Sequence, residues 1–99
     1  MAVAMMIVLP EGNAEFYDAV MEQLEWDTTE KPQGFVSHIA GPGPNGWTVV
    51  DVWESEADFN RFAETRLGPA MARATDGEPP QVEPRFFPIH NMDLVPAQV

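Results

Sequence analysis

His38 and Asp51 are the two residues whose types and spacing could carry out proton-transfer chemistry. They flank the turn-forming sequence GPGPNG, so the segments that contain them are expected to form a β-hairpin. If the turn centres near residues 44 and 45, the numbers of paired residues sum to about 89, which places the two side chains opposite each other with Cβ atoms ~5 Å apart. A sum of about 88 would instead place them on opposite faces of the sheet.

An opposed imidazole and carboxylate have a possible catalytic use and a possible structural one. The carboxylate of Asp51 could orient the imidazole of His38, which would then act as a general base toward an acidic phenol or carbon acid. Alternatively, the pair only satisfies two polar groups inside the hairpin. The catalytic hypothesis predicts that His38 and Asp51 are neighbours that face a pocket on the helix side of the sheet.

Aromatic side chains supply candidate walls for such a pocket. Trp47 and Trp53 share the parity of Asp51 in their strand, so the three side chains should lie on one face. Each indole could form a flat wall for an aromatic ligand, or could belong to the core or to a dimer interface. The remaining candidates for substrate binding, which could equally be packing or surface residues, are Phe59, Phe62, Met71 and His90.

The sequence gives little reason to expect a cofactor, a metal or a covalent nucleophile. There is no cysteine, and two histidines without an organised carboxylate cluster make a weak metal site. The glycine-rich segment GPGPNG has prolines where a phosphate-binding loop needs N–H donors. Ser37 should point away from His38, and Ser55 is expected to cap a helix, so nucleophilic hydrolysis is disfavoured.

Length and charge limit the architecture and the partners. The 99 residues suffice for one domain, residues 1–99, with a single core. Sixteen acidic residues against five basic ones give a net charge of −11, which disfavours nucleic acid and anionic membranes as partners. No apolar stretch approaches the ~20 residues of a membrane-spanning helix. A cytoplasmic location is the expectation that follows by default.

The first half of the chain predicts strand, helix and hairpin. Residues 2–9 are apolar on both faces, as in a central strand. Asn13 can cap an amphipathic helix over 14–25. Residues 35–41 and 47–54 are then the two strands of the hairpin.

The second half predicts a further helix and an edge strand. Ser55 is the expected N-cap of a helix that Gly68 and Pro69 should break, with one more turn over 70–74. Residues 82–92 contain two prolines on the same lateral side, which a strand tolerates only at the edge of a sheet.

Arginines follow the acidic start of the second helix. Arg61, Arg66 and Arg73 are interpreted as solvated charges that balance nearby acids, with an anion gate as the weaker alternative.

The order β-α-β-β-α-β predicts an α+β, ferredoxin-like fold, with a four-stranded antiparallel sheet and two helices on one face. Apolar residues occur at both parities of the first, third and fourth strands, yet the chain has no third layer to cover the other face. The economical solution is a homodimer in which two sheets pack face to face.

Three segments carry a resemblance to a known family. GFVSHIAGPGPNGWTVVDVWESEADFNRF, then RLGPAM, then FFPIHN resemble the dimeric α/β-barrel superfamily, which includes antibiotic-biosynthesis monooxygenase-like and stress-responsive barrel proteins. The most specific piece is the strand-to-helix junction VWESEADF. The resemblance implies a dimeric barrel with a small-molecule pocket in each protomer, and it does not imply one reaction.

Two branches of that superfamily differ from this chain at informative positions. The haem-degrading branch uses a histidine of the second helix and an asparagine of the first strand, whereas 55–74 contains no histidine and 2–9 no asparagine. The cofactor-free branch that oxidises anthrones uses a tryptophan where this chain has Trp53. The polar partners of that tryptophan are replaced here by Val49 and Phe59.

Two hypotheses about function follow. The first is a small cofactor-independent enzyme that acts on a hydrophobic, aromatic or polyketide-like molecule by proton transfer, with or without oxygen, as a monooxygenase, cyclase, isomerase or decarboxylase. The second is a non-catalytic dimeric barrel that binds a small ligand or has a stress-response or structural role. A polar group inside the pocket would favour the first, and a pocket filled by its own side chains would favour the second.

Overall fold

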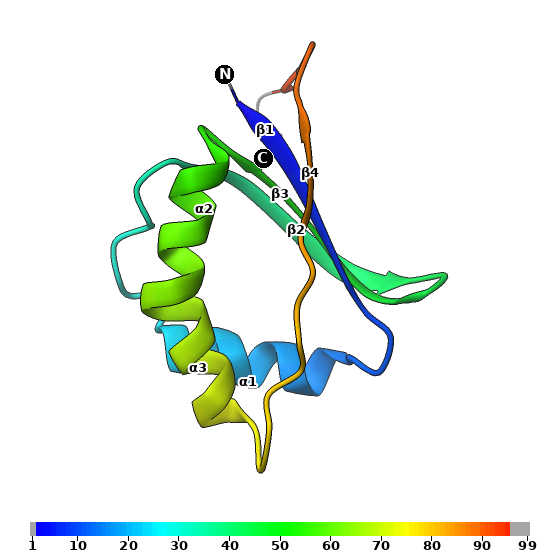
Figure 1. Cartoon of the computed structure of the whole chain (residues 1–99), viewed down its shortest axis with the longest axis vertical. Coiled ribbons are helices and arrows are strands. Elements are labelled where there is room, and N and C mark those ends of the chain that lie inside the picture. Colours follow the sequence, from blue (N-terminus) through cyan, green and yellow to red (C-terminus); the bar gives the residue numbers. More distant parts are fainter. Residues whose placement is uncertain (1, 96–99) are drawn as a thin grey trace.

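The computed structural model describes residues 2–95 (Figure 1). In chain order the elements are β1 Val3–Leu9, α1 Ala14–Leu24, β2 Phe35–Gly43, β3 Gly46–Trp53, α2 Glu56–Phe62, a π-helical segment Ala63–Leu67, α3 Gly68–Ala74 and β4 Arg85–Pro88. The helices lie together on one side of the sheet (Figure 1). The α+β, ferredoxin-like fold predicted from the sequence is confirmed.

The four strands form one antiparallel sheet in the order β2-β3-β1-β4. Strand β4 is an edge strand beside β1, as the two prolines required, and Val3 pairs with both Trp53 and Pro88. The strand is shorter than the predicted 82–92. It spans only Arg85–Pro88, and Pro84, which lacks an N–H group, lies directly before its first residue.

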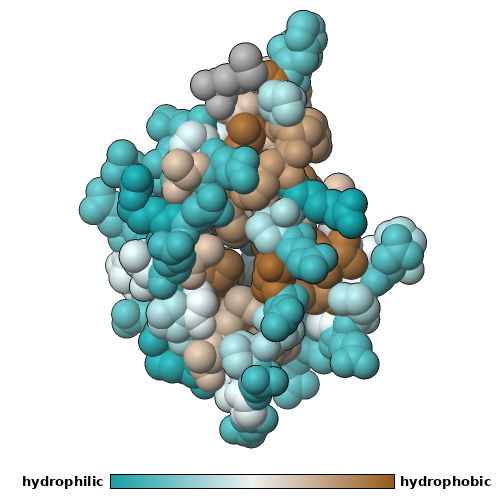
Figure 2. Space-filling view, viewed as in Figure 1, coloured by the Kyte–Doolittle hydropathy of each residue, from teal (hydrophilic) through white to brown (hydrophobic). Residues whose placement is uncertain are grey.

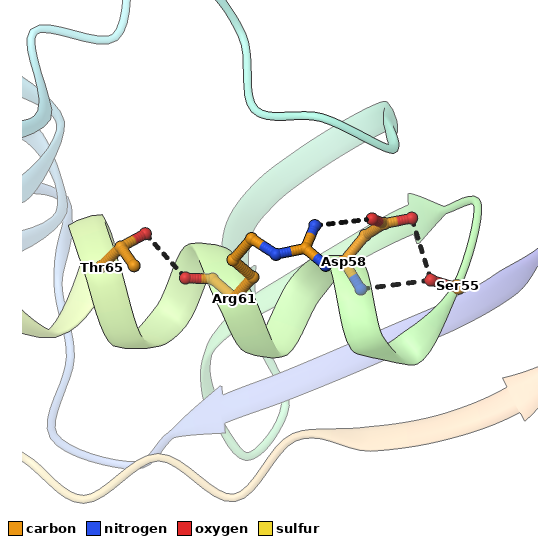
Figure 3. Close-up of polar contacts among 4 residues, drawn as sticks. All are labelled: Ser55, Asp58, Arg61 and Thr65. Carbon is orange, nitrogen blue, oxygen red and sulfur yellow. Dashed lines mark hydrogen bonds and ion pairs between the residues drawn. The ribbon is translucent and has the colours of Figure 1, made fainter.

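Capping side chains define where the helices begin. The Asn13 side chain accepts a hydrogen bond from the Phe16 amide at 2.8 Å. Ser55 Oγ accepts one from the Asp58 amide at 3.1 Å and donates one to Asp58 Oδ2 at 2.9 Å (Figure 3). Arg61 then pairs with Asp58 at 3.2 Å, one turn further along α2. The two predicted N-caps are therefore confirmed.

The predicted break at Gly68 and Pro69 is wrong. Gly68 has right-handed helical angles, and its N–H donates to the carbonyl of Ala63, five residues earlier. This wider π-helical turn lets α2 continue into α3, because Pro69 can occupy the first turn of α3, where a backbone N–H is not needed.

Two arginines of the second helical region donate hydrogen bonds to the first helix and the loop that follows it. Arg66 donates to the carbonyl of Leu24 at 3.4 Å and to the hydroxyl of Thr29 at 3.0 Å. Arg73 donates to the side chain of Gln23 at 3.0 Å and to its carbonyl at 3.3 Å. Arg73 is exposed, in agreement with its interpretation as a solvated charge, whereas Arg66 is partly buried. Both arginines satisfy groups at or just beyond the C-terminal end of α1, where the helix dipole favours positive charge.

The two faces of the sheet have different surroundings. The helices bury one face around a core made by Met5, Ile7, Val20, Leu24, Trp53, Phe59, Phe62, Ala70 and Met71. On the other face apolar side chains of β1, β2 and β4 remain exposed, among them Met6, Val8, Ile39 and Phe87. Figure 2 shows brown, apolar side chains over the strands and more teal, polar ones over the helices.

None of the helices in 2–95 has the length and apolar character required to cross a bilayer.

Candidate functional site

A cavity of about 80 Å³ lies between the helices and the covered face of the sheet. Most of its wall is apolar or aromatic, and the only carboxylate and the only imidazole in the wall, among the residues described, are those of Asp51 and His38. The predicted wall residues Trp47, Trp53, Phe59, Phe62 and Met71 all line it. His90 does not: it is exposed beyond the end of β4, so the structure places it outside the cavity.

His38 and Asp51 are paired neighbours on β2 and β3, so the predicted register is confirmed. His38 Nδ1 lies 2.6 Å from Asp51 Oδ1. The second carboxylate oxygen, Oδ2, accepts a hydrogen bond of 3.0 Å from Trp53 Nε1. The carboxylate of Asp51 is buried and both of its oxygens have a partner, which satisfies the condition for stable burial of a charged group.

Tyr17, on α1, completes a chain of polar groups that the sequence did not predict. Its hydroxyl lies 2.5 Å from His38 Nε2. An ionised carboxylate can only accept, so Nδ1 of His38 donates to Asp51, and Nε2 is left to accept the proton of the Tyr17 hydroxyl. The resulting order of hydrogen bonds is Tyr17 to His38 to Asp51, with Trp53 holding the far oxygen of the carboxylate.

Tyr17 keeps its proton more strongly than an exposed tyrosine does. Burial is the main cause, and the negative charge of Asp51 adds to it; together they raise the pKa of the Tyr17 hydroxyl above its ordinary value of about 10. Smaller contributions in the same direction come from Asp18 and Asp27. Tyr17 is therefore a neutral hydrogen-bond donor at physiological pH, which suits its place at the end of the chain.

Aromatic rings fix the positions of these polar groups. The rings of Tyr17 and His38 are nearly parallel, with an interplanar angle of 6° and centroids 5.9 Å apart, and the centroid of Trp26 lies 6.0 Å from that of the imidazole. Trp53 packs against Phe59 and Phe62 at 5.5 Å and 5.4 Å. The contacts leave little freedom for the His38 and Trp53 side chains, which holds their hydrogen bonds to Asp51 in one geometry.

The sequence held a weak signal for Tyr17. It is the sole tyrosine of the chain, and it lies on the apolar stripe of α1 beside Phe16. By periodicity alone, that position only widens the hydrophobic stripe of the helix. Nothing local says that α1 crosses the sheet where His38 lies, so the contact could be found only in the tertiary structure.

The indole nitrogen of Trp47 is a buried polar atom in an unusual situation. The Trp47 indole lines the cavity and packs beside Tyr17 with ring centroids 5.4 Å apart. Its Nε1 is buried and, among the described residues, has no hydrogen-bond partner.

Within residues 2–95, no group of three or more histidine, aspartate or glutamate side chains is arranged to hold a metal ion.

Comparison with known proteins gives matches by structure only. No family model matches the chain, and no curated protein sequence matches it. The cofactor-independent oxygenase SnoaB from Streptomyces nogalater, as its N63A mutant, superposes with a TM-score of 0.58 at 19% identity, over 92% of this chain and 94% of that one. A suggested antibiotic biosynthesis monooxygenase from Deinococcus radiodurans superposes with a TM-score of 0.56 at 10% identity, over 96% and 98%.

A third similar structure is the heme-degrader MhuD from Mycobacterium tuberculosis, with a TM-score of 0.50 at 19% identity over 95% of this chain and 99% of that one. The likenesses cover nearly the whole of each chain. The chain thus has the fold of the antibiotic-biosynthesis monooxygenase-like proteins, as the resemblance in sequence implied. Identities this low establish the fold and leave the reaction to be inferred from the site.

Proposed function

We propose that the protein is a cofactor-independent enzyme of the antibiotic-biosynthesis monooxygenase-like group that moves a proton on a hydrophobic, aromatic or polyketide-like molecule. The observation that carries the proposal is the continuous chain of hydrogen bonds from Tyr17 through His38 to Asp51, set in the wall of an apolar cavity. An imidazole oriented by a buried carboxylate is a suitable general base near neutral pH.

The proposed step is a relayed deprotonation. The oxygen of Tyr17 takes a proton from an acidic C–H or O–H of the ligand while the Tyr17 hydroxyl proton passes to Nε2 of His38. Tyr17 ends neutral, His38 ends as an imidazolium facing the Asp51 carboxylate, and the electron pair stays on the ligand as an enolate or phenolate. Low water content in an apolar cavity strengthens the attraction between the imidazolium and the carboxylate.

The proposed assembly is a homodimer. It would form through the face of the sheet that the helices leave uncovered, called the open face below. Ile39 is 68% exposed and Phe87 58% exposed, although both are large apolar side chains on regular strands. A second copy of the same sheet would cover these side chains with a surface of matching character. The cavity lies on the opposite side of the sheet, so each protomer would keep its own site.

Exchange of protons for deuterons on a simple aromatic ketone tests the chemistry in place of the natural substrate. β-Tetralone has one aromatic ring and enolisable C–H groups, and its exchange in heavy water is followed by NMR. The wild-type protein should accelerate the exchange, and His38→Ala should reduce the acceleration by ~10²–10⁴-fold, the range typical of a lost general base.

The matched control is His90→Ala, which removes the chain's other histidine from an exposed position outside the cavity. It should leave the exchange rate unchanged. Equal rates for wild type and His38→Ala, in protein that remains folded by circular dichroism, would refute the catalytic role.

A second candidate function is a non-catalytic barrel that binds a small ligand. The small size of the cavity favours a non-catalytic barrel, because about 80 Å³ is well below the ~300–1,000 Å³ of sites for drug-sized ligands and the side chains of the wall therefore fill much of the space. Met21 and Met71 line the cavity, and a change of their flexible side chains would enlarge it. Saturable binding of β-tetralone without any acceleration of exchange would support this second function over the first.

A further inference from the structure

The indole N–H of Trp47 is a donor that has nothing to donate to in the structure of residues 2–95. Most buried donors in folded proteins have a partner, and leaving one unpaired lowers stability. Trp53 illustrates the ordinary case in the same strand, because its indole N–H is paired with Asp51. Trp47 lines the cavity, so an acceptor atom of a bound ligand would supply the missing partner.

Trp47 and Tyr17 bring two neighbouring polar side chains to a cavity whose wall is mostly apolar. Their ring centroids are 5.4 Å apart. The Tyr17 hydroxyl is already engaged with His38, whereas the Trp47 N–H is free to define where a ligand oxygen sits. Phe59, Phe62 and Met71, which also line the cavity, offer only apolar contacts.

The charges around the cavity select against anions. None of the described residues that line it is a lysine or an arginine, and the wall contains the carboxylate of Asp51. The net charge of −11 adds a general repulsion. A carboxylate or phosphate ligand would lose its hydration without gaining a positive partner, whereas a neutral carbonyl or phenol loses less.

We propose that Trp47 is a specificity-determining residue whose N–H binds the oxygen of an uncharged, flat aromatic ketone or phenol, and that this oxygen lies beside Tyr17. The inference rests on the proposed function in one respect, because the bound oxygen is the atom on which the enolate charge would develop. A hydrogen bond from Trp47 would stabilise that charge and orient the adjacent C–H toward Tyr17.

Binding of three matched probes tests the inference independently of turnover. β-Tetralone has the carbonyl oxygen, tetralin is the same bicyclic frame without it, and β-naphthoate is a bicyclic anion. Titrations followed by tryptophan fluorescence or NMR should show β-tetralone binding ~10-fold more tightly than tetralin, as expected for one recovered hydrogen bond, and β-naphthoate binding most weakly.

Trp47→Phe keeps an aromatic wall and removes only the N–H donor. It should abolish the preference for β-tetralone over tetralin. Trp26→Phe is the matched control, because it alters another indole of the same wall; it should weaken both ligands alike and keep their ratio.

Three results would overturn the inference: equal affinities of wild type for β-tetralone and tetralin, a preference that survives in Trp47→Phe, or tightest binding of β-naphthoate. Failure to bind any of the probes would overturn it as well. If the preference and its loss in Trp47→Phe are observed but His38→Ala exchanges protons as fast as wild type, the proposed catalysis fails and the binding site stands.

Discussion

The two faces of the sheet at strand β3 differ in which kind of side chain is buried. The face covered by the helices buries a carboxylate, and the open face leaves aliphatic side chains exposed. On the covered face, Asp51 is 5% exposed and shares its side of the strand with Trp47 and Trp53. On the open face, Val50 pairs across the hairpin with Ile39, which is 68% exposed. A carboxylate is thus buried while aliphatic side chains face outward, the reverse of the arrangement expected for a monomeric two-layer protein.

The difference supports separate proposed roles for the two faces. The covered face can hold a carboxylate because His38 and Trp53 satisfy both of its oxygens. The open face has no such polar network among the residues described, and its exposed apolar side chains would gain free energy from any surface that removes them from water. We therefore propose chemistry for the covered face and assembly for the open one.

Among substitutions that test the contrast between the two faces, Trp53→Ala is expected to have the largest effect on stability. Trp53 is fully buried, packs against three phenylalanines and donates to Asp51. The free energy of unfolding, measured with urea, should fall by ~3–5 kcal/mol. On the open face, Ile39→Ala should lower it by less than ~1 kcal/mol at protein concentrations that keep the chain monomeric. Similar losses at the two positions would contradict the contrast between the faces.

Removal of the buried carboxylate is expected to have the next largest effect. Asp51→Ala leaves His38 Nδ1 and Trp53 Nε1 without an acceptor, so the free energy of unfolding should fall by ~1–3 kcal/mol. The control is Thr48→Ala, three residues away on the open face, where a single hydroxyl bond to the Gly46 carbonyl is lost. That loss should be no more than ~1 kcal/mol. Equal stability of Asp51→Ala and wild type would show that the buried network contributes nothing to the fold.

Introducing a charge on the open face tests the proposal that this face forms the dimer interface. The wild-type protein should sediment at about twice the chain mass of 11.0 kDa. Ile39→Asp should raise the dissociation constant of the dimer at least ~10-fold, because an unpaired carboxylate would be buried between two sheets. Asn60→Asp adds the same charge on an exposed helix position and should leave the dimer intact. A wild-type monomer at micromolar concentration would refute the dimer.

The smallest effect concerns the pH dependence of stability. Burial and the charge of Asp51 raise the pKa of Tyr17 in the folded state, so the folded protein binds this proton more tightly than the unfolded chain does. The stabilisation is fully present below pH ~10, where a tyrosine of the unfolded chain ionises, and is lost as the pH rises through the folded pKa.

Because Tyr17 is the only tyrosine, the ultraviolet absorbance of tyrosinate reports its titration directly. The folded protein should titrate above the unfolded one, and the alkaline loss of stability should be smaller in Tyr17→Phe. Coincident titration curves for folded and urea-unfolded protein would contradict the raised pKa.

Local signals predict most of the fold, and they fail where a distant contact decides. The cap residues Asn13 and Ser55, the turn at residues 44 and 45, and the edge prolines each act on their own neighbourhood, so the sequence reports them correctly. The break predicted at Gly68 and Pro69 is wrong because a π-helical turn that bypasses them leaves no local mark. The interpretation of Arg66 fails for a similar reason, since its partners are more than thirty residues away in the chain.

In the candidate site too, some features follow from local sequence and others depend on distant contacts. The sequence by itself determined that His38 and Asp51 are opposed, because hairpin register depends on a short turn and on the alternation of side chains along a strand. It also determined that Trp47 and Trp53 share their face.

Only the tertiary structure decided that Tyr17 reaches His38, that Trp47 keeps an unpaired N–H at the cavity within the described residues, and that His90 lies outside it. These contacts depend on the angle at which α1 crosses the sheet and on the path of the chain beyond β4. Both are set by the packing of the whole core and not by any residue's neighbours in sequence.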